Sequence, residues 1–149
     1  MLGDFYESAA RWTTARRGLV ECDQTPVSLE FSAPVEFQGD AGYWTPEHFL
    51  LGAVASCFVT TFRAIAELSK FEFASLEVSA RGTVEKSADG YQFGSIVIHP
   101  TLGVNQQEQS ERGLKLLGKA ERACLISRSL KTAVQMKPRV EVATPAAMA

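Results

Sequence analysis

The sequence has few residues that bind metals or form permanent cross-links. Its 149 residues include only three cysteines, Cys22, Cys57 and Cys124, with no CxxC pair, and only two histidines, His48 and His99. The histidines do not lie at metal-ligand spacing from the cysteines, so we expect no bound metal. An odd number of cysteines in a reducing compartment also argues against a structural disulfide framework. Any disulfide in this protein would therefore be reversible and functional.

Positive charge is also in short supply. Seventeen acidic residues against 15 basic residues give a formal net charge of −2, and the lysines and arginines are scattered along the chain. A nucleic-acid partner needs a concentrated positive surface, so we expect none. The opening segment MLGDFYESAA contains no basic stretch followed by an apolar run. Because a secretory signal has that pattern, we expect a cytoplasmic protein.

Apolar residues, in contrast, are concentrated in one long stretch, TPEHFLLGAVASCFVTTFRAIAEL, at residues 45–68. Thr45 is a suitable N-cap and Pro46 a suitable first helical residue, so we expect a helix from there to about Ser69. Small or polar residues interrupt the stretch at Gly52, Ser56, Thr60, Thr61 and Arg63. With these interruptions and no positive flank, the pattern favours a buried helix of a soluble protein over a membrane-spanning helix.

Strand patterns precede and follow this predicted helix. Residues 5–37 favour two or three short antiparallel strands, with breaks that include Pro26 and Pro34. Residues 73–104 alternate polar and apolar residues and predict two strands joined by a turn at residues 88–90. The sequence therefore predicts antiparallel sheet on both sides of the helix.

A second, amphipathic helix is expected over residues 105–127. Its apolar side would carry Leu114, Leu117, Ala120, Ala123 and Cys124. Cys124 would lie in the last turn. A closing strand over residues 134–142 and a frayed tail from about residue 144 complete the chain. The order of strands, helix, strands, helix and strand predicts a single α+β domain over residues 1–149.

The first predicted helix has apolar residues on every side. Such a helix must be covered on every side, and one further long helix with short strands covers one side easily and the other with difficulty. A second copy of the chain is the simplest cover, because two such helices can pack on each other at the centre of a twofold homodimer. We therefore expect a homodimer.

Two segments of the chain form a specific pair of motifs. TPEHFLLGAVASCF at residues 45–58 joins a Pro-Glu helix start to an Ala-Ser-Cys-Phe run, and ERACLIS at residues 121–127 places a second cysteine near a helix end. Together they resemble the paired signature of the OsmC/Ohr family of organic hydroperoxide reductases and osmotically inducible proteins. WTTARRG at residues 12–18 and APVEFQGDAGYW at residues 33–44 also lie in the family's order. The resemblance thus extends over most of the chain.

This resemblance implies an OsmC-like α+β fold, in which antiparallel sheets surround two long helices and two chains intertwine as a homodimer. It implies a stress-response peroxidase that reduces organic hydroperoxides, holds no bound cofactor and depends on an external thiol reductant of dithiol or lipoyl type. Where many members have Cys-Pro, this chain has Leu125 after Cys124, and Arg128 stands where an Asn is frequent. These departures make it more similar to the broader OsmC-like subgroup than to the dedicated Ohr enzymes.

The resemblance also implies roles for particular residues. Cys57 matches the peroxidatic cysteine, Cys124 the resolving cysteine and Glu47 the helix-opening glutamate. Arg16 matches the family's arginine, with the adjacent Arg17 as an alternative. The chemistry of these residue types agrees, because a thiolate that attacks a peroxide needs a nearby positive charge. The sulfenic acid that forms also needs a second thiol before it is over-oxidised.

Spacing along the helix separates two of these residues. Glu47 and Cys57 are roughly 15 Å apart along the axis, at about 1.5 Å per residue. They cannot meet one arginine within one subunit, so a shared site would take Glu47 from the partner. Without the resemblance, Glu47 is an ordinary first-turn residue that the helix dipole favours.

Two functions remain open at this point. The first is a hydroperoxide reductase whose apolar helix walls favour organic substrates over hydrogen peroxide. The second is a non-catalytic dimeric module of the same fold that binds a small hydrophobic ligand or a thiol adduct. The presence of both cysteines together with Arg16 and Glu47 favours the enzyme.

Overall fold

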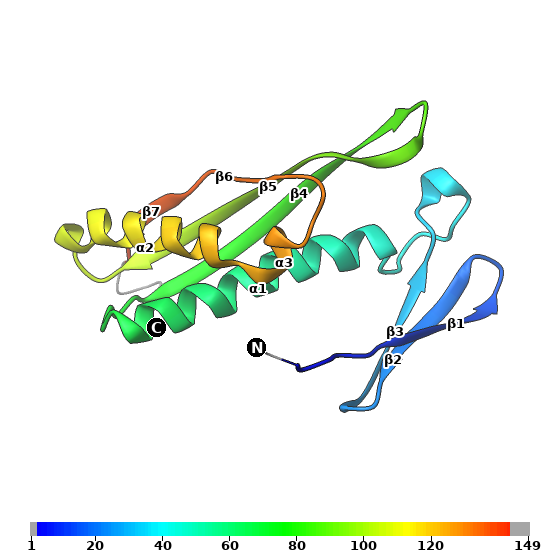
Figure 1. Cartoon of the computed structure of the whole chain (residues 1–149), viewed down its shortest axis with the longest axis horizontal. Coiled ribbons are helices and arrows are strands. Elements are labelled where there is room, and N and C mark those ends of the chain that lie inside the picture. Colours follow the sequence, from blue (N-terminus) through cyan, green and yellow to red (C-terminus); the bar gives the residue numbers. More distant parts are fainter. Residues whose placement is uncertain (1–2, 144–149) are drawn as a thin grey trace. The chain divides into compact units, whose positions relative to one another are not determined.

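The computed structural model describes residues 3–143, so the predicted frayed tail from residue 144 lies outside the described residues. The chain forms two compact units, Met1–Leu50 and Leu51–Ala149. The boundary between them lies inside helix α1, Pro46–Leu68, which is continuous across it (Figure 1).

The first unit contains a small antiparallel sheet. Its strands are β1 (Ala9–Thr14), β2 (Arg17–Cys22) and β3 (Thr25–Ser32), in the order β1-β2-β3. The strands expected within residues 5–37 are thus confirmed, but the predicted break at Pro26 is wrong, because Pro26 lies inside β3. Gly18 lies where the strands approach closely, because a Cβ there would be 2.4 Å from the Arg11 carbonyl oxygen and 2.6 Å from the Phe31 ring. Only glycine fits at this point of β2.

Helix α1 begins where the sequence predicts. The backbone N–H of His48 donates to Thr45 Oγ1 at 3.1 Å, which makes Thr45 the N-cap, and Pro46 is the first helical residue. The helix ends at Leu68, one residue before the predicted Ser69. The predicted helix is confirmed at both ends.

The second unit is built on a long hairpin. Strands β4 (Ser75–Ser87) and β5 (Gly90–Val104) pair antiparallel. Gly90 follows the turn with a φ of 117°, a conformation that favours glycine. Both predicted strands and the turn between them are confirmed.

The closing segment forms two short strands rather than one. β6 (Val134–Met136) and β7 (Arg139–Val142) each pair parallel with β5. The N–H of Lys137 still donates to the Ile98 carbonyl at 2.9 Å. The next residue is Pro138, which has no N–H to give to the ladder. The predicted single strand over residues 134–142 is therefore wrong at its centre.

The predicted second helix is also interrupted. A 3₁₀ helix, η2 (Gln107–Gln109), leads into α2 (Ser110–Ala123), and a separate short helix, α3 (Leu125–Arg128), follows. Cys124 lies between α2 and α3 with a φ of −64° and a ψ of 113°, which is an extended conformation. The prediction that Cys124 lies in the last turn of one helix is wrong, because this ψ turns the chain out of the helical path.

The buried face of α2 matches the predicted one only in part: Leu117 and Ala120 are buried as predicted. Leu114 is 45% exposed, and Ala123 is exposed as well. The buried residues of α2 are Gly113, Leu116, Leu117 and Ala120. Residues three apart advance by about 300° around a helix of about 3.6 residues per turn, so the predicted series in steps of three drifts off the buried face. A series of residues that alternates steps of three and four stays on the buried face.

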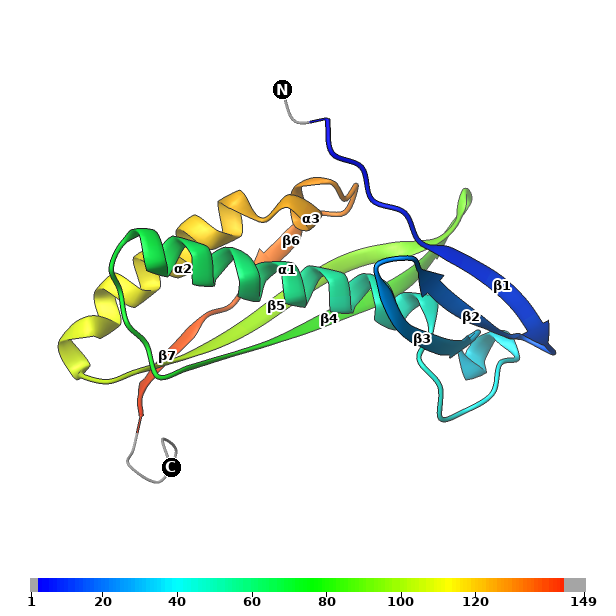
Figure 2. The same cartoon turned by 90° about the horizontal axis from the view of Figure 1, so that it is seen from below.

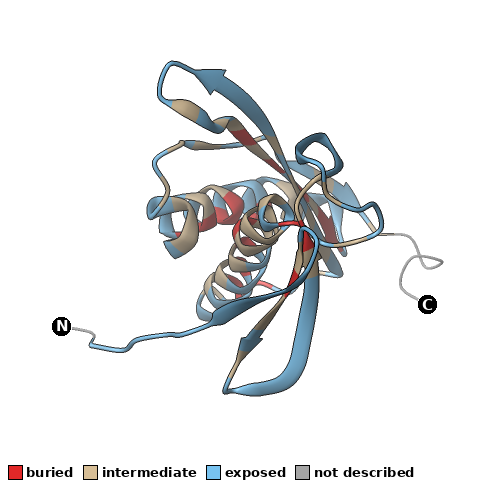
Figure 3. Ribbon diagram, turned by 90° about the vertical axis from the view of Figure 1, so that its right-hand side faces the viewer, coloured by how far each residue is buried: buried red, intermediate tan, exposed pale blue. Residues whose placement is uncertain are grey.

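The core of the second unit lies between the helices and one face of the β4–β5 hairpin (Figure 2). α1 contributes a stripe at spacings of four, namely Val54, Phe58, Phe62 and Ala66. Its partners from β5 and α2 are Ile98, Leu102, Val104, Leu116, Leu117 and Ala120. Figure 3 shows the buried parts of the ribbon in red. This two-layer packing confirms an α+β fold with antiparallel sheets and two main helices.

Much of α1 is not covered within one chain. Beyond the exposed His48 of the first turn, its exposed polar residues are Ser56, Thr60, Arg63 and Glu67. Arg63 and Glu67 form an ion pair at 3.1 Å. The expectation that the helix is apolar on every side is therefore wrong for its C-terminal half, where these residues form a polar edge at helical spacing. The half-buried apolar side chains of the N-terminal half include Phe49, Leu50, Leu51, Ala53 and Ala55.

Within residues 3–143, one helix, α1, is long and apolar enough to cross a membrane by length and composition. Of its most apolar window, 22% is buried in the chain. The core helix of a soluble protein passes the same test, so the test alone does not separate the two cases. The fully buried Phe58 and Phe62 show that one face of α1 belongs to a protein core.

Candidate active site

The thiol of Cys57 lies at the junction between α2 and α3. The side chain of Cys124 and the backbone N–H groups of Leu125 and Ile126 lie near enough to this thiol to lower its pKa. Thr61 Oγ1 lies 3.8 Å from Cys57 Sγ, one turn further along α1. Both cysteines are free thiols. The structure thus brings together the two cysteines that the sequence singled out, although they are far apart in the chain.

The surroundings of Cys57 favour its thiolate. Burial by itself raises the pKa of Cys57, but the N–H of Ile126, the thiol of Cys124, the hydroxyl of Thr61 and the N–H of Leu125 together lower the pKa below the ordinary cysteine value. Hydrogen-bond donors that point at a sulfur stabilise its charged form. At neutral pH, a larger fraction of Cys57 than of an ordinary cysteine is therefore the thiolate, which is the nucleophilic form.

The pKa of Cys124 is shifted in the opposite direction, above the ordinary cysteine value. It is buried, with 1% of its surface exposed. Burial is the main cause that raises the pKa of Cys124, the backbone N–H and hydroxyl of Ser127 oppose it, and the neighbouring Cys57 raises the pKa further. The Ser127 hydroxyl donates to Cys124 Sγ at 3.5 Å. The two thiols thus differ in acidity in the direction that a nucleophile and a resolving thiol require.

The break between α2 and α3 creates this environment. Because Cys124 is extended, α3 starts a new helix, and the first N–H groups of a helix have no partner within it. Two of them, from Leu125 and Ile126, instead help to lower the pKa of Cys57. Sequence reasoning missed these donors. They are backbone groups that any residue could supply, so only the conformation at Cys124 identifies them.

The arginines that follow β1 have different surroundings. Arg16 is exposed in the turn between β1 and β2. Its guanidinium donates to two neutral groups, the Phe37 carbonyl at 3.5 Å and Gln38 Oε1 at 3.1 Å. Among residues 3–143, no carboxylate lies within ion-pair distance of Arg16. Its positive charge is therefore not neutralised within the described part of the chain.

Arg17, in contrast, is already paired. Its Nη1 donates to Tyr43 Oη at 2.7 Å, and its guanidinium carbon lies 5.4 Å from the centroid of the Tyr43 ring. Arg17 Nε lies 3.1 Å from Asp40 Oδ2, an ion pair in which the N–H is not aligned with the oxygen. The hydrogen bond to Tyr43 is the main cause that raises the pKa of Arg17. The positive charge of Arg17 is thus already paired with residues of its own unit.

Glu47 lies half-buried in the first turn of α1. Its Oε2 is buried and has no hydrogen-bond partner among the described residues. A buried carboxylate oxygen without a donor is costly. Because α1 is continuous from Pro46 to Leu68, Glu47 remains roughly 15 Å from Cys57 along the axis. Within one chain, α1 cannot bring these two side chains into one site.

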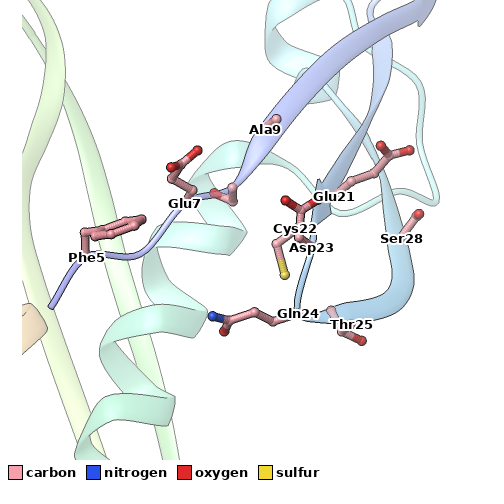
Figure 4. Close-up of a pocket in the computed structure, with 10 residues that line it drawn as sticks. Phe5, Glu7, Ala9, Glu21, Cys22, Asp23, Gln24, Thr25 and Ser28 are labelled. Atoms are coloured by element: carbon pink, nitrogen blue, oxygen red, sulfur yellow. The ribbon is translucent and has the colours of Figure 1, made fainter.

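The third cysteine lies in a different setting. Cys22 lines a pocket of about 410 Å³ in the first unit, with its sulfur pointing into the pocket (Figure 4). The charged residues of the wall, Glu7, Glu21 and Asp23, are all acidic, so this pocket lacks the positive charge that a peroxidatic cysteine needs. In the described part of the chain, no group of three or more His, Cys, Asp or Glu side chains could hold a metal ion.

Comparison with known families and proteins shows which chains this one resembles. Residues 39–139 match the model of the family described as OsmC-like protein. Among curated proteins, the uncharacterized protein YmaD of Bacillus subtilis (strain 168) is 26% identical over 136 residues, which are 89% of this chain and 91% of YmaD. The matched segment of the family model contains Glu47, Cys57 and Cys124.

Solved structures share the fold. The organic hydroperoxide resistance protein OsmC from Legionella pneumophila has a TM-score of 0.73 at 23% identity, over 93% of this chain and 99% of that chain. A Vibrio cholerae protein, proposed to confer organic hydroperoxide resistance and solved with captopril in one of its active sites, has a TM-score of 0.70 at 18% identity, over 93% and 94%. Because the family model also spans more than two thirds of the sequence, this chain belongs to the OsmC-like protein family.

Proposed function

We propose that this OsmC-like protein is a thiol-dependent peroxidase that reduces organic hydroperoxides to alcohols, with Cys57 as the nucleophile and Cys124 as the resolving thiol. The observation that carries the proposal is the contact between two free thiols of opposite character, in which the pKa of Cys57 is lowered and the pKa of Cys124 is raised. A structural pair of buried cysteines has no need of this difference. A two-step peroxidase needs it in both steps.

The chemistry balances with these two thiols and one external reductant. The Cys57 thiolate attacks the terminal oxygen of the hydroperoxide ROOH, an S–O bond forms and the O–O bond breaks. The alkoxide takes a proton and leaves as the alcohol, and Cys57 becomes a sulfenic acid. The Cys124 thiol then attacks the Cys57 sulfur, so that a disulfide forms and water leaves. An external dithiol restores both thiols by exchange and is itself oxidised.

Arg16 supplies the positive charge in this proposal. Its guanidinium contacts only neutral groups, so its charge remains available to a thiolate and to the oxygen that becomes the alkoxide. Glu47 of the partner subunit would pair with Arg16 and orient its planar fork. Two observations support this second assignment: Glu47 Oε2 lacks a donor in one chain, and the length of α1 separates Glu47 from Cys57 of the same chain.

A homodimer follows from these assignments. The half-buried apolar residues in the N-terminal half of α1 need a cover, and a second copy of the helix supplies it. We expect light scattering at micromolar concentration to give twice the 16.2 kDa of one chain, with an interface above about 2,000 Å². Ala53→Lys, on the apolar half of α1, should weaken the dimer. Glu67→Lys, on the polar edge, is the matched control and should leave it intact. A monomeric wild-type protein would contradict the assignment of Glu47 to the partner.

The second candidate function is a non-catalytic dimeric module that binds a small hydrophobic ligand or thiol adduct. The captopril in an active site of the related V. cholerae protein favours it, since a pocket of this fold can hold a small molecule. The unequal acidity of the two thiols favours the peroxidase, because ligand binding alone does not require it.

One experiment separates the two functions. The reduced protein is mixed with cumene hydroperoxide in a stopped-flow instrument, with hydrogen peroxide as the comparison. We expect the organic substrate to react at least about tenfold faster, because burial of each CH₂ contributes about 0.8 kcal/mol. Mass spectrometry of the oxidised product should show a peptide that joins Cys57 to Cys124. Absence of consumption would leave the binding module as the better function, and a dominant disulfide to Cys22 would overturn the pairing.

A further inference from the structure

The first unit contains a set of polar contacts that the proposed reaction does not use. Arg17 of β2 is bound by Asp40 and Tyr43, which come from the loop between β3 and α1. We refer to Arg17, Asp40 and Tyr43 as the Arg17 clamp, and to residues 33–44 as the 33–44 loop. The clamp lies at one end of this loop, and the contacts of Arg16 lie nearer its start.

Arg16 forms hydrogen bonds with the 33–44 loop through both its backbone and its side chain. The Arg16 carbonyl accepts from the N–H of Ala33 at 3.0 Å. Its guanidinium donates to the Phe37 carbonyl and to the side chain of Gln38. The path of this loop therefore decides where the Arg16 charge lies. A charge stabilises a reacting centre best when its position is set in advance.

The loop does not hold this path by local preference. Gln38 has a φ of 68°, a conformation that costs free energy for a residue other than glycine, so contacts elsewhere must offset it. At Gly39 a Cβ would lie 1.6 Å from the Ala33 carbonyl oxygen. The N–H of Asp40 donates to the hydroxyl of Ser32 at 2.8 Å, and Ser32 is fully buried. The loop is thus held by tertiary contacts immediately before and within the clamp.

We propose that Arg17 is a positioning residue: with Asp40 and Tyr43 it fixes the 33–44 loop, and the loop in turn fixes Arg16 for the proposed peroxidase reaction. This inference rests on the proposed function. It assigns different roles to two adjacent arginines: Arg17 positions the loop, and Arg16 acts in the reaction. Arg17 is anchored in β2 opposite Ser32, so it ties the loop to the sheet. Arg16, which has no carboxylate partner in residues 3–143, remains free to act on the peroxide.

The test combines loop dynamics with the rate of the first chemical step. Tyr43→Phe removes the hydroxyl that accepts from Arg17 Nη1 but keeps the ring, and Arg17→Lys removes the fork but keeps the charge. Native-state hydrogen exchange reports the loop through the amides of Ala33, Gln38 and Gly39, which donate to Arg16, Val35 and Pro34. Arg11→Lys is the matched control, because Arg11 is an exposed arginine of the same sheet with its own carboxylate, Glu21.

We expect both clamp variants to speed exchange at these loop amides and to leave exchange in β4 and β5 unchanged. They should also slow sulfenic acid formation at Cys57 by roughly 5-fold to 10-fold, the scale of one lost hydrogen bond. In an Arg16→Ala background, the same substitutions should slow the step by less than about twofold, because residues that act through one another are not additive.

Each contrary result has a distinct meaning. Unchanged loop exchange in Tyr43→Phe and Arg17→Lys would overturn the clamp. A loss of rate that persists at full size in the Arg16→Ala background would also overturn it, because Arg17 would then act at the site directly. A wild-type protein that consumes no hydroperoxide would overturn the proposed function itself, a result that the wild-type stopped-flow trace distinguishes from the other two.

Discussion

Cys57→Ser protein should consume no organic hydroperoxide, whereas Cys124→Ser protein should still consume about one equivalent in its first turnover and then stop. Removal of the nucleophile abolishes the first chemical step. Removal of the resolving thiol leaves that step intact, and Cys57 then remains a sulfenic acid that is further oxidised to the irreversible sulfinic form. Single-turnover stopped flow measures the consumption, and mass spectrometry identifies the oxidation state of Cys57.

The pH dependence of the same step adds a second readout. Because the pKa of Cys57 is lowered, its thiolate persists to lower pH than that of an ordinary cysteine, and the rate should fall only below the folded pKa. Cys22→Ser is the control and should keep both the rate and the pH profile, since the acidic pocket of Cys22 lacks the positive charge that the reaction needs. Equal single-turnover rates for wild type and Cys57→Ser would contradict the assignment of the nucleophile.

Arg16→Ala should slow the first step by roughly 100-fold, on the scale of a lost preorganised charge at a reacting centre. The side chain is exposed and its contacts are with neutral groups, so its truncation should not change the fold. Stopped-flow rates with cumene hydroperoxide measure the loss. Arg11→Ala, in the neighbouring strand and also exposed, should change the rate by less than about twofold, since exposed ion pairs contribute little.

The comparison with Arg17 makes this prediction specific. Arg17→Ala should be slower than wild type but faster than Arg16→Ala, because it disturbs only the position of the charge and does not remove it. If Arg17→Ala loses more activity than Arg16→Ala, the two roles are reversed. Glu47→Gln should also slow the reaction, and mixed dimers of Glu47→Gln with Cys57→Ser subunits would reveal whether the two residues serve one site across the interface.

Local signals in the sequence were sufficient for several elements. Thr45 and Pro46 predict the start of α1, and the structure confirms both positions because capping depends on neighbouring residues alone. The hairpin of β4 and β5 was predictable from alternation and its turn, in which Gly90 takes a positive φ. The pair of cysteines was identified by the motifs around Cys57 and Cys124, and the match of residues 39–139 confirms the family.

Other features could not be read from local pattern. The predicted apolar series includes Leu114, yet the buried face runs through Gly113 and Leu116 instead, because the packing partners on β5 select the face. Helix α2 ends at Ala123, although no proline or helix-capping glycine in the sequence marks that end. The choice between Arg16 and Arg17 was open for a similar reason, since both precede Gly18 and have the same chemistry.

By itself, the sequence determined the order of the elements, the span of α1, the family and the two cysteines, because caps, periodicity and motifs act over a few neighbouring residues. Only the tertiary structure decided that Cys124 is extended, that the N–H groups of Leu125 and Ile126 point at Cys57, and that Arg17 is paired with Asp40 and Tyr43. These features depend on contacts between residues distant in the chain. The acidity of a thiol and the availability of a charge are set by burial and by neighbouring donors, which exist only once the chain has folded.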